Sequence, residues 1–192
     1  MEMMQLDEVI QQLKSASRPE SLRGMKKFGI NVENAYGVSI PILRKLAKDI
    51  GKNHDLAQRL WSSRVHEARI LAALIDDPNK VTSKQMDCWV HDFDSWDLCD
   101  QCCGNLFDKT RSAYQKASAW SRQKEEYVKR AAFALMAPLA VHDKETTNEP
   151  FQRFLEIVER ESYCYTPENE GRSCECQNRS NTRRTLDLIF IL

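Results

Sequence analysis

Trp96 and Asp100 are the residues of this sequence whose types and spacing best suit chemistry. Side chains four positions apart on a helix share one face, with Cβ atoms about 5–6 Å apart, so an indole and a carboxylate can line one small site. A carboxylate about 4 Å from a positive charge contributes about 4 kcal/mol at an effective dielectric of about 20, and an indole face adds roughly 0.5–2 kcal/mol. The pair therefore suits a site that stabilises a cation. The alternative is that Trp96 belongs to the core and Asp100 is a solvated helix acid.

Two basic residues, Lys129 and Arg130, stand in an otherwise apolar segment. Arg130 could bind a phosphate group or pair with Asp100, and the alternative is an arginine that extends its charged end from the core face to solvent. Asp97 adjoins the Trp96–Asp100 pair, but a neighbouring position on a helix points about 100° away. We therefore leave Asp97 out of the chemistry.

Arg44 and Lys45 form a second basic pair, directly after the predicted helix start Ser39-Ile40-Pro41. The free N–H groups of a helix start can bind a phosphate, so this segment is a candidate for contact with nucleic acid. The alternative for Arg44 is an ion pair with an acid such as Glu67. Because the 28 basic and 28 acidic residues of the whole chain cancel, any affinity for nucleic acid needs a local patch of this kind.

Cys99, Cys102 and Cys103, with Cys88 and His91 upstream, raise the possibility of a zinc site. The first three would lie on one helix rather than on the tight turn that zinc sites use, and no second Cys-x-x-Cys follows them. We therefore interpret them as buried thiols that behave as small apolar side chains, and we expect neither a metal nor a cofactor. Seven cysteines in a chain without an export signal also disfavour a disulfide framework.

The elements that must position these residues are predicted to be helices. Apolar residues recur with a helical period, no alternating strand-like run is present, and Ser17 is the expected N-cap of the second helix. The predicted helices cover about residues 6–13, 17–28, 40–50, 54–62, 66–76, 83–92, 95–107, 110–121, 124–139 and 148–161. Helices of this length joined by short loops are typical of stacked antiparallel pairs, although no crisp sequence repeat is visible. Trp61, Trp89 and Trp120 are expected to be core anchors.

A chain of 192 residues is long enough for one domain and too short for two independent ones. We predict a helical domain over residues 1–162 and an irregular tail over 163–192, where no helical period is present. The start of the chain has no secretory signal, and no segment approaches about 18 consecutive apolar residues, so we expect a cytoplasmic protein.

Four motifs resemble, in order and spacing, those of the DNA alkylation-repair enzymes of the AlkD type. They are Tyr36-Gly37-Val38-Ser39-Ile40-Pro41-x-Leu43-Arg44, His66-Glu67-Ala68-Arg69, Trp96-x-x-x-Asp100 and Lys129-Arg130-Ala131. The resemblance extends from residue 24 to about residue 160. It implies an all-α fold of HEAT-like helical repeats that binds duplex DNA, associates with the nucleoid and removes positively charged alkylated purines.

In this family the catalytic aspartate, with an aromatic residue four positions before it, matches Asp100 and Trp96, and an arginine on the next repeat matches Arg130. The resemblance implies that Asp100 stabilises an oxocarbenium-like sugar and orients water while a 3-methyladenine or 7-methylguanine type of base departs. The base is already cationic, so no general acid and no cofactor are required. Lys129, Arg44 and Lys45 are the remaining candidates for DNA contact.

Two features depart from the family pattern. The position that carries an N-terminal aromatic residue falls around Gly24, and no later helix has the family's Trp-Ala-Leu-Arg-like segment. Family members continue with further helices where this chain has residues 163–192, from which we expect a truncation or a change of reading frame near Ser162. The alternative function is a non-catalytic HEAT-repeat module that binds DNA or a protein partner.

Overall fold

The computed structural model describes residues 5–143 and 148–163, and within these ranges every regular element is a helix. The elements are α1 (Leu6–Ser15), α2 (Pro19–Lys27), α3 (Ile40–Ile50), α4 (His54–Ser62), α5 (His66–Ile75), α6 (Ser83–His91), α7 (Trp96–Asn105), the short 3-10 helix η1 (Phe107–Lys109), α8 (Ala113–Trp120), α9 (Glu126–His142) and α10 (Asn148–Tyr163). The predicted all-α fold is confirmed. No helix within these ranges has the length and apolar character needed to cross a membrane.

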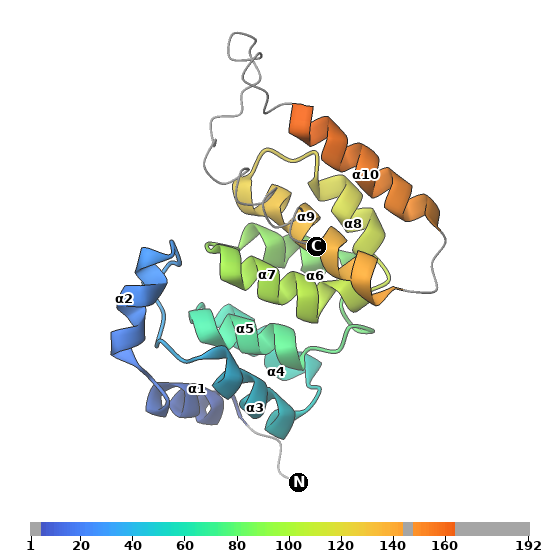
Figure 1. The fold of residues 1–192 in the computed structure, drawn as a ribbon. Coiled ribbons are helices and arrows are strands. Elements are labelled where there is room, and N and C mark those ends of the chain that lie inside the picture. Colours follow the sequence, from blue (N-terminus) through green and yellow to red (C-terminus); the bar gives the residue numbers. More distant parts are fainter. Residues whose placement is uncertain (1–4, 144–147, 164–192) are drawn as a thin grey trace.

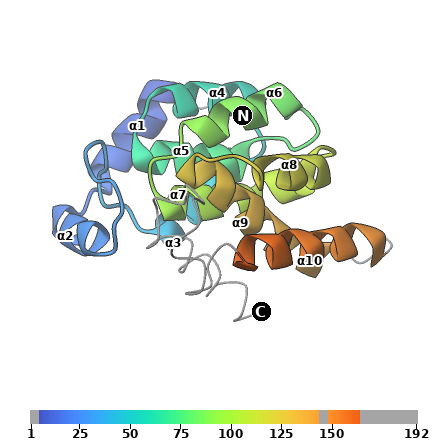
Figure 2. The same ribbon diagram turned by 90° about the horizontal axis from the view of Figure 1, so that it is seen from above.

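The helices stack in layers from one end of the molecule to the other (Figure 1). The central row consists of α5, α7 and α9, since α5 contacts α7 and α7 contacts α9. Their partners α4 and α8 pack against α5 and α9, respectively, α3 packs against α5 at one end, and α10 packs against α8 at the other. Figure 2 shows the same row from above, between α4 and α6 on one side and α3 and α10 on the other.

Side-chain contacts between layers recur at a separation of about 30 residues. Trp61 donates its indole N–H to Asp92, 31 positions later, and His66 pairs with Asp97 at the same separation. Asp100 pairs with Arg130, 30 positions later. The fold therefore has a structural repeat of about this length, which the sequence alone did not reveal.

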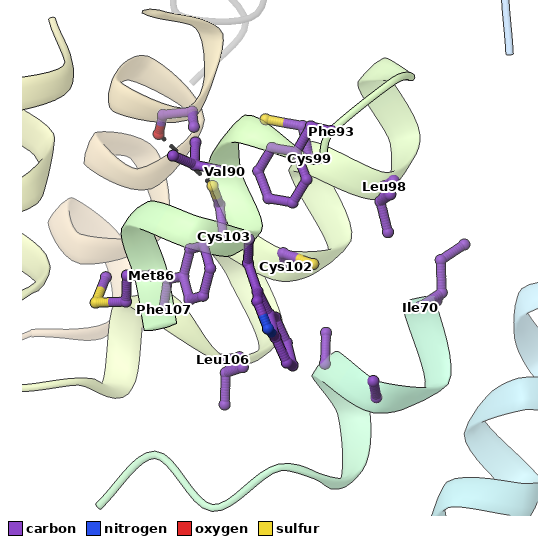
Figure 3. Packing of buried hydrophobic residues seen from close by; sticks show 14 of the residues in the cluster. Ile70, Met86, Val90, Phe93, Leu98, Cys99, Cys102, Cys103, Leu106 and Phe107 are labelled. Carbon is purple, nitrogen blue, oxygen red and sulfur yellow. Dashed lines mark hydrogen bonds between the residues drawn. The ribbon is translucent and has the colours of Figure 1, made fainter. Parts of the chain in front are cut away.

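A continuous apolar core joins the layers. Trp61 of α4 stacks on Trp89 of α6 with ring centroids 3.9 Å apart and an interplanar angle of 3°. Trp120 is equally buried, and its indole N–H donates to Asp87 at 3.0 Å. The prediction that these three tryptophans are core anchors is confirmed. Figure 3 shows part of this core, in which Phe107 and the α7 cysteines lie among other buried side chains such as Met86, Val90 and Phe93.

The boundaries of several helices differ from prediction for identifiable reasons. Ser17 does not cap α2: the N-cap is Arg18, and the Ser17 hydroxyl instead donates to the carbonyl of Tyr36 at 2.7 Å. The helix predicted over 110–121 begins three residues later, at Ala113, because η1 and a bend at Thr110 precede it. The helix predicted to end at 139 continues to His142.

The irregular tail predicted over residues 163–192 lies outside the described residues, except for Tyr163, which is the last residue of α10.

Candidate active site

The first residue of α7, Trp96, lies at the surface with 37% of its area exposed. Its indole N–H donates to the main-chain carbonyl of Phe28, at the end of α2, over 2.9 Å. The alternative that Trp96 belongs to the core is therefore wrong. The hydrogen bond fixes the ring while leaving part of it open to solvent.

Asp100, one turn further along α7, forms a two-pronged ion pair with Arg130 of α9. Arg130 Nε donates to Oδ1 at 3.1 Å, and Arg130 Nη2 donates to Oδ2 at 2.8 Å. The exposed fractions are 29% for the Asp100 side chain and 9% for that of Arg130. Asp100 is thus not a freely solvated acid, and Arg130 does not extend to solvent. Of the roles weighed for Arg130, pairing with Asp100 is confirmed.

The three residues form one cluster, because the guanidinium carbon of Arg130 lies 5.9 Å from the centroid of the Trp96 ring. That distance is within the range of a cation–π contact. Each oxygen of Asp100 uses one lone pair for Arg130 and keeps another for a further partner. The cluster therefore presents a fixed carboxylate next to a partly exposed indole.

Burial and ion pairing oppose each other at Asp100. Burial raises the pKa of its carboxyl, the hydrogen bonds and charge of Arg130 lower it, and the charge of Asp97 raises it further, with a net upward shift. For Arg130, burial lowers the pKa, but Asp100 more than compensates and the net shift is upward. Without Arg130, the ionised form of this half-buried carboxylate would be less favoured.

A second ion pair lies at the starts of α5 and α7, where His66 Nε2 is 2.9 Å from Asp97 Oδ2. Burial lowers the pKa of His66, but the hydrogen bond and charge of Asp97 outweigh it and raise the pKa overall. Burial raises the pKa of Asp97, and His66 reverses this to a net decrease. The other oxygen of Asp97 is buried and has no hydrogen-bond partner in the described residues. Sequence reasoning missed this pair, because its two residues are 31 positions apart and no local pattern links them.

Glu67 is fully enclosed, with 1% of its area exposed, and it binds the loop before α3. Its carboxylate accepts hydrogen bonds from the main-chain N–H groups of Tyr36 at 3.0 Å, Gly37 at 2.6 Å and Val38 at 3.2 Å. The alternative that Glu67 pairs with Arg44 is therefore wrong, because the loop takes its place. By binding these main-chain N–H groups, Glu67 holds the segment that leads from α2 into α3.

The predicted DNA-binding cations do not form one cluster. Lys129 makes an ion pair with Glu161 of α10 at 2.6 Å, and Arg130 is bound to Asp100. Arg44 and Lys45 are exposed on α3, and no ion pair joins either of them to another residue of the described ranges.

The α7 cysteines are buried, as predicted. Cys99, Cys102 and Cys103 are fully enclosed, and burial raises the pKa of the Cys102 and Cys103 thiols well above the ordinary value. Cys88 is instead exposed. The part of the chain that the structure describes contains no group of three or more metal-ligating side chains, so the zinc hypothesis gains no support there.

An exposed aromatic residue, Phe28, lies where sequence reasoning did not look for one. It is 65% exposed, and its carbonyl holds the Trp96 indole. It comes four positions after Gly24, one helical turn from the place where the family pattern has an aromatic residue. In the sequence Phe28 marks only the end of a helix, because its proximity to Trp96 depends on a contact across 68 positions.

Comparison with known proteins places this chain in a family. A model of the family described as DNA alkylation repair enzyme matches residues 9–162. The uncharacterized protein Lmo0209 of Listeria monocytogenes is 25% identical over 122 residues, which are 62% of this chain and 54% of that protein. The uncharacterized protein Lin0241 of Listeria innocua is 23% identical over 164 residues, 83% of this chain and 73% of the relative. The chain thus spans about half the length of the first relative.

A solved structure superimposes with a TM-score of 0.78, covering 97% of this chain and 76% of the other at 20% identity. It is described as a new family of proteins related to the HEAT-like repeat DNA glycosylases, with affinity for branched DNA structures. This likeness shows that the fold is of the HEAT-like repeat type. Together with the match over residues 9–162, the findings establish that the chain belongs to the DNA alkylation repair enzyme family.

Proposed function

We propose that this protein is a DNA glycosylase that hydrolyses the N-glycosidic bond of cationic alkylated purines, of the 3-methyladenine and 7-methylguanine type, in duplex DNA. The observation that carries the proposal is the Asp100 carboxylate, held by both prongs of Arg130 beside the exposed face of Trp96. The acting unit is residues 1–162, a range supported by the family match to residue 162.

Asp100 is the catalytic residue in this proposal. The bond between the sugar carbon and the base nitrogen breaks with its electron pair moving to the base, which leaves neutral because it was cationic. The sugar becomes an oxocarbenium-like cation, which the carboxylate stabilises electrostatically. Water then adds to the sugar carbon and loses its proton toward Asp100. Arg130 keeps the carboxylate ionised and fixed, and its two hydrogen bonds leave lone pairs free for the water.

Trp96 lines the site and favours a cationic base over a neutral one. The partly exposed indole offers a ring face, which contributes roughly 0.5–2 kcal/mol toward a cation. Both hydrogen bonds of Arg130 go to Asp100, so the charge of Arg130 is paired although it lies near the same ring. The main-chain carbonyl of Phe28, itself an exposed aromatic residue, holds the indole in place.

The test is release of 7-methylguanine from methylated duplex DNA. The Asp100→Asn variant is expected to release the base at least about a hundredfold more slowly, because loss of about 4 kcal/mol of charge stabilisation is worth several hundredfold in rate. Asp55→Asn, at an exposed position of α4, is the matched control and is expected to keep the wild-type rate. Equal rates in Asp100→Asn and wild type would rule out the assigned role.

A second candidate is a non-catalytic module that binds DNA. It is favoured by the affinity for branched DNA of the structural relative and by the ion pair that already neutralises Asp100. Binding of a four-way junction and of a plain duplex, compared by gel shift, discriminates the two. Tight junction binding that is unchanged in Asp100→Asn, without base release by the wild type, supports the module and contradicts the glycosylase.

A further inference from the structure

The helix α2 stands apart from the rest of the molecule. It lies at the edge in both views, and none of its nine residues is buried (Figure 1, Figure 2). At its start the Arg18 N–H donates to the Tyr36 carbonyl at 2.9 Å, and at its end Trp96 donates to the Phe28 carbonyl. Just beyond, the Asn31 side chain donates to Asp94 at 3.0 Å. Polar links at its two ends, rather than a packed apolar face, thus set the position of α2 beside α7.

The charged residues of α2 and its N-cap are mostly positive. Arg18, Arg23, Lys26 and Lys27 are all exposed, and Glu20 is the single acid among them. None of these four cations forms an ion pair or a side-chain hydrogen bond within residues 5–143 and 148–163. By contrast, the cations of α9 beside the site are bound to Glu161 and Asp100. In a chain with no net charge, α2 is therefore a local source of unpaired positive charge next to the candidate active site.

Stabilisation of the helix itself does not account for this pattern. Lys26 and Lys27 in the last turn interact favourably with the helix dipole. Arg18, however, is the N-cap, where a positive charge is unfavourable, and Arg23 lies in the middle, where the dipole has little effect. The cations also contribute no packing, because the helix has no buried face. Their arrangement fits an external anion better than an internal partner.

We propose that α2 is a DNA-binding arm whose cations bind backbone phosphates of the strand next to the site. Nine residues of helix extend about 13 Å, and one DNA strand carries a phosphate about every 3.4 Å of axis, so α2 can span about four phosphates. The hydrogen bond from Trp96 to Phe28 places the last turn of α2 next to the candidate active site, so the arm would position the strand that presents the damaged base. The choice of DNA as the ligand rests on the proposed function.

The test is duplex binding by the full chain, measured by fluorescence anisotropy between about 50 and 200 mM salt. For Lys26→Gln/Lys27→Gln we expect about tenfold weaker binding and a plot of log K against log salt that is shallower by about 2, because each phosphate contact contributes about 0.9 to the slope. The control, Lys80→Gln/Lys84→Gln, removes two exposed lysines beyond the far end of α5 and is expected to bind like wild type.

A second variant separates phosphate binding from any effect on the end of the helix. Arg23→Gln changes a mid-helix position and is expected to make the salt slope shallower by about 1. Glutamine has nearly the helix propensity of lysine and arginine, so circular dichroism should be unchanged in all three variants.

Three outcomes are decisive. If both α2 variants keep the wild-type affinity and salt slope and release the base normally, α2 is not a DNA-binding arm and the glycosylase proposal stands. Weakened binding in these variants, without base release by the wild type, supports the arm and contradicts the glycosylase. Failure of the wild type to bind DNA at low salt overturns both, and points to an acidic protein surface as the partner of α2.

Discussion

At the scale of single residues, the candidate site depends on charges that are half-buried yet paired. Asp100 and Asp97 lie three positions apart on α7, and each is matched by a cation from a neighbouring layer, Arg130 from α9 and His66 from α5. Leaving either carboxylate unpaired would cost more than the pair itself contributes, because one buried charge would then have no partner. The two pairs therefore keep two acids ionised side by side on one helix.

The His66–Asp97 pair predicts a pH-dependent stability. The folded-state pKa of His66 is raised above about 6.5. The contribution of His66 to the free energy of unfolding is therefore fully present below that pH and is lost as the pH rises through the raised value. The folded-state pKa of Asp97 is lowered below about 3.8. The contribution of Asp97 to the free energy of unfolding is therefore present above that pH and is lost as the pH falls through the lowered value. The pair is therefore strongest between these limits, in mildly acidic solution.

Urea unfolding at several pH values checks this expectation. The free energy of unfolding should fall more steeply from pH about 6 to pH about 9 in wild type than in His66→Gln, which removes the titrating group. His91→Gln, at an exposed position of α6, is the control and should follow the wild-type curve. Parallel curves for wild type and His66→Gln would show that the pair makes no such contribution.

At the scale of elements, the loop before α3 determines where α2 begins. Glu67 collects the N–H groups of residues 36–38, and Gly37 has φ of +77°, a conformation that favours glycine. A Cβ atom at Gly37 would overlap the carbonyl oxygen of Arg18. The loop therefore lies so close to the start of α2 that no side chain fits between them. The position of α2, and with it the Phe28–Trp96 link, depends on this close approach.

Gly37 and Gly24 therefore give opposite predictions. Gly37→Ala should lower the free energy of unfolding by at least about 2 kcal/mol, from the left-handed backbone and the overlap with Arg18. Gly24→Ala, within α2 and with no neighbouring atom near the added methyl group, should raise it by about 0.5–1 kcal/mol. Urea unfolding of both variants measures the difference, and similar effects of the two substitutions would contradict the close approach at Gly37.

At the scale of the whole molecule, the tryptophans fall into buried ones and one that is partly exposed, Trp96. Trp89 is 3% exposed and stacks on Trp61, so it joins two layers of the core, whereas Trp96 is 37% exposed at the site. The layers share one continuous apolar core, and loss of a central side chain should therefore be felt across the fold.

We expect Trp89→Ala to lower the free energy of unfolding by about 3–5 kcal/mol, because it removes a large buried side chain and leaves a cavity. Trp96→Ala should cost only about 1 kcal/mol, the value of its hydrogen bond to Phe28. Chemical unfolding followed by circular dichroism compares them. Equal losses would mean that Trp96 is a structural residue, which its exposed ring argues against.

The sequence by itself determined the helices and the local part of the site. Helical period, caps and breakers act within a few residues, so the end of α3 at Gly51 and the shared face of Trp96 and Asp100 follow from local spacing. The family motifs added the identity of the fold. What they left open was the choice among partners for each charge.

Only the tertiary structure decided those partners. Arg130 pairs with Asp100, Glu67 accepts N–H groups of a loop instead of pairing with Arg44, and the carbonyl of Phe28 accepts the indole N–H of Trp96. Each of these contacts joins residues about 30 or more positions apart, and the packing of one layer on the next brings them together. A local sequence pattern carries no information about that register, because different stackings would satisfy the same helical period.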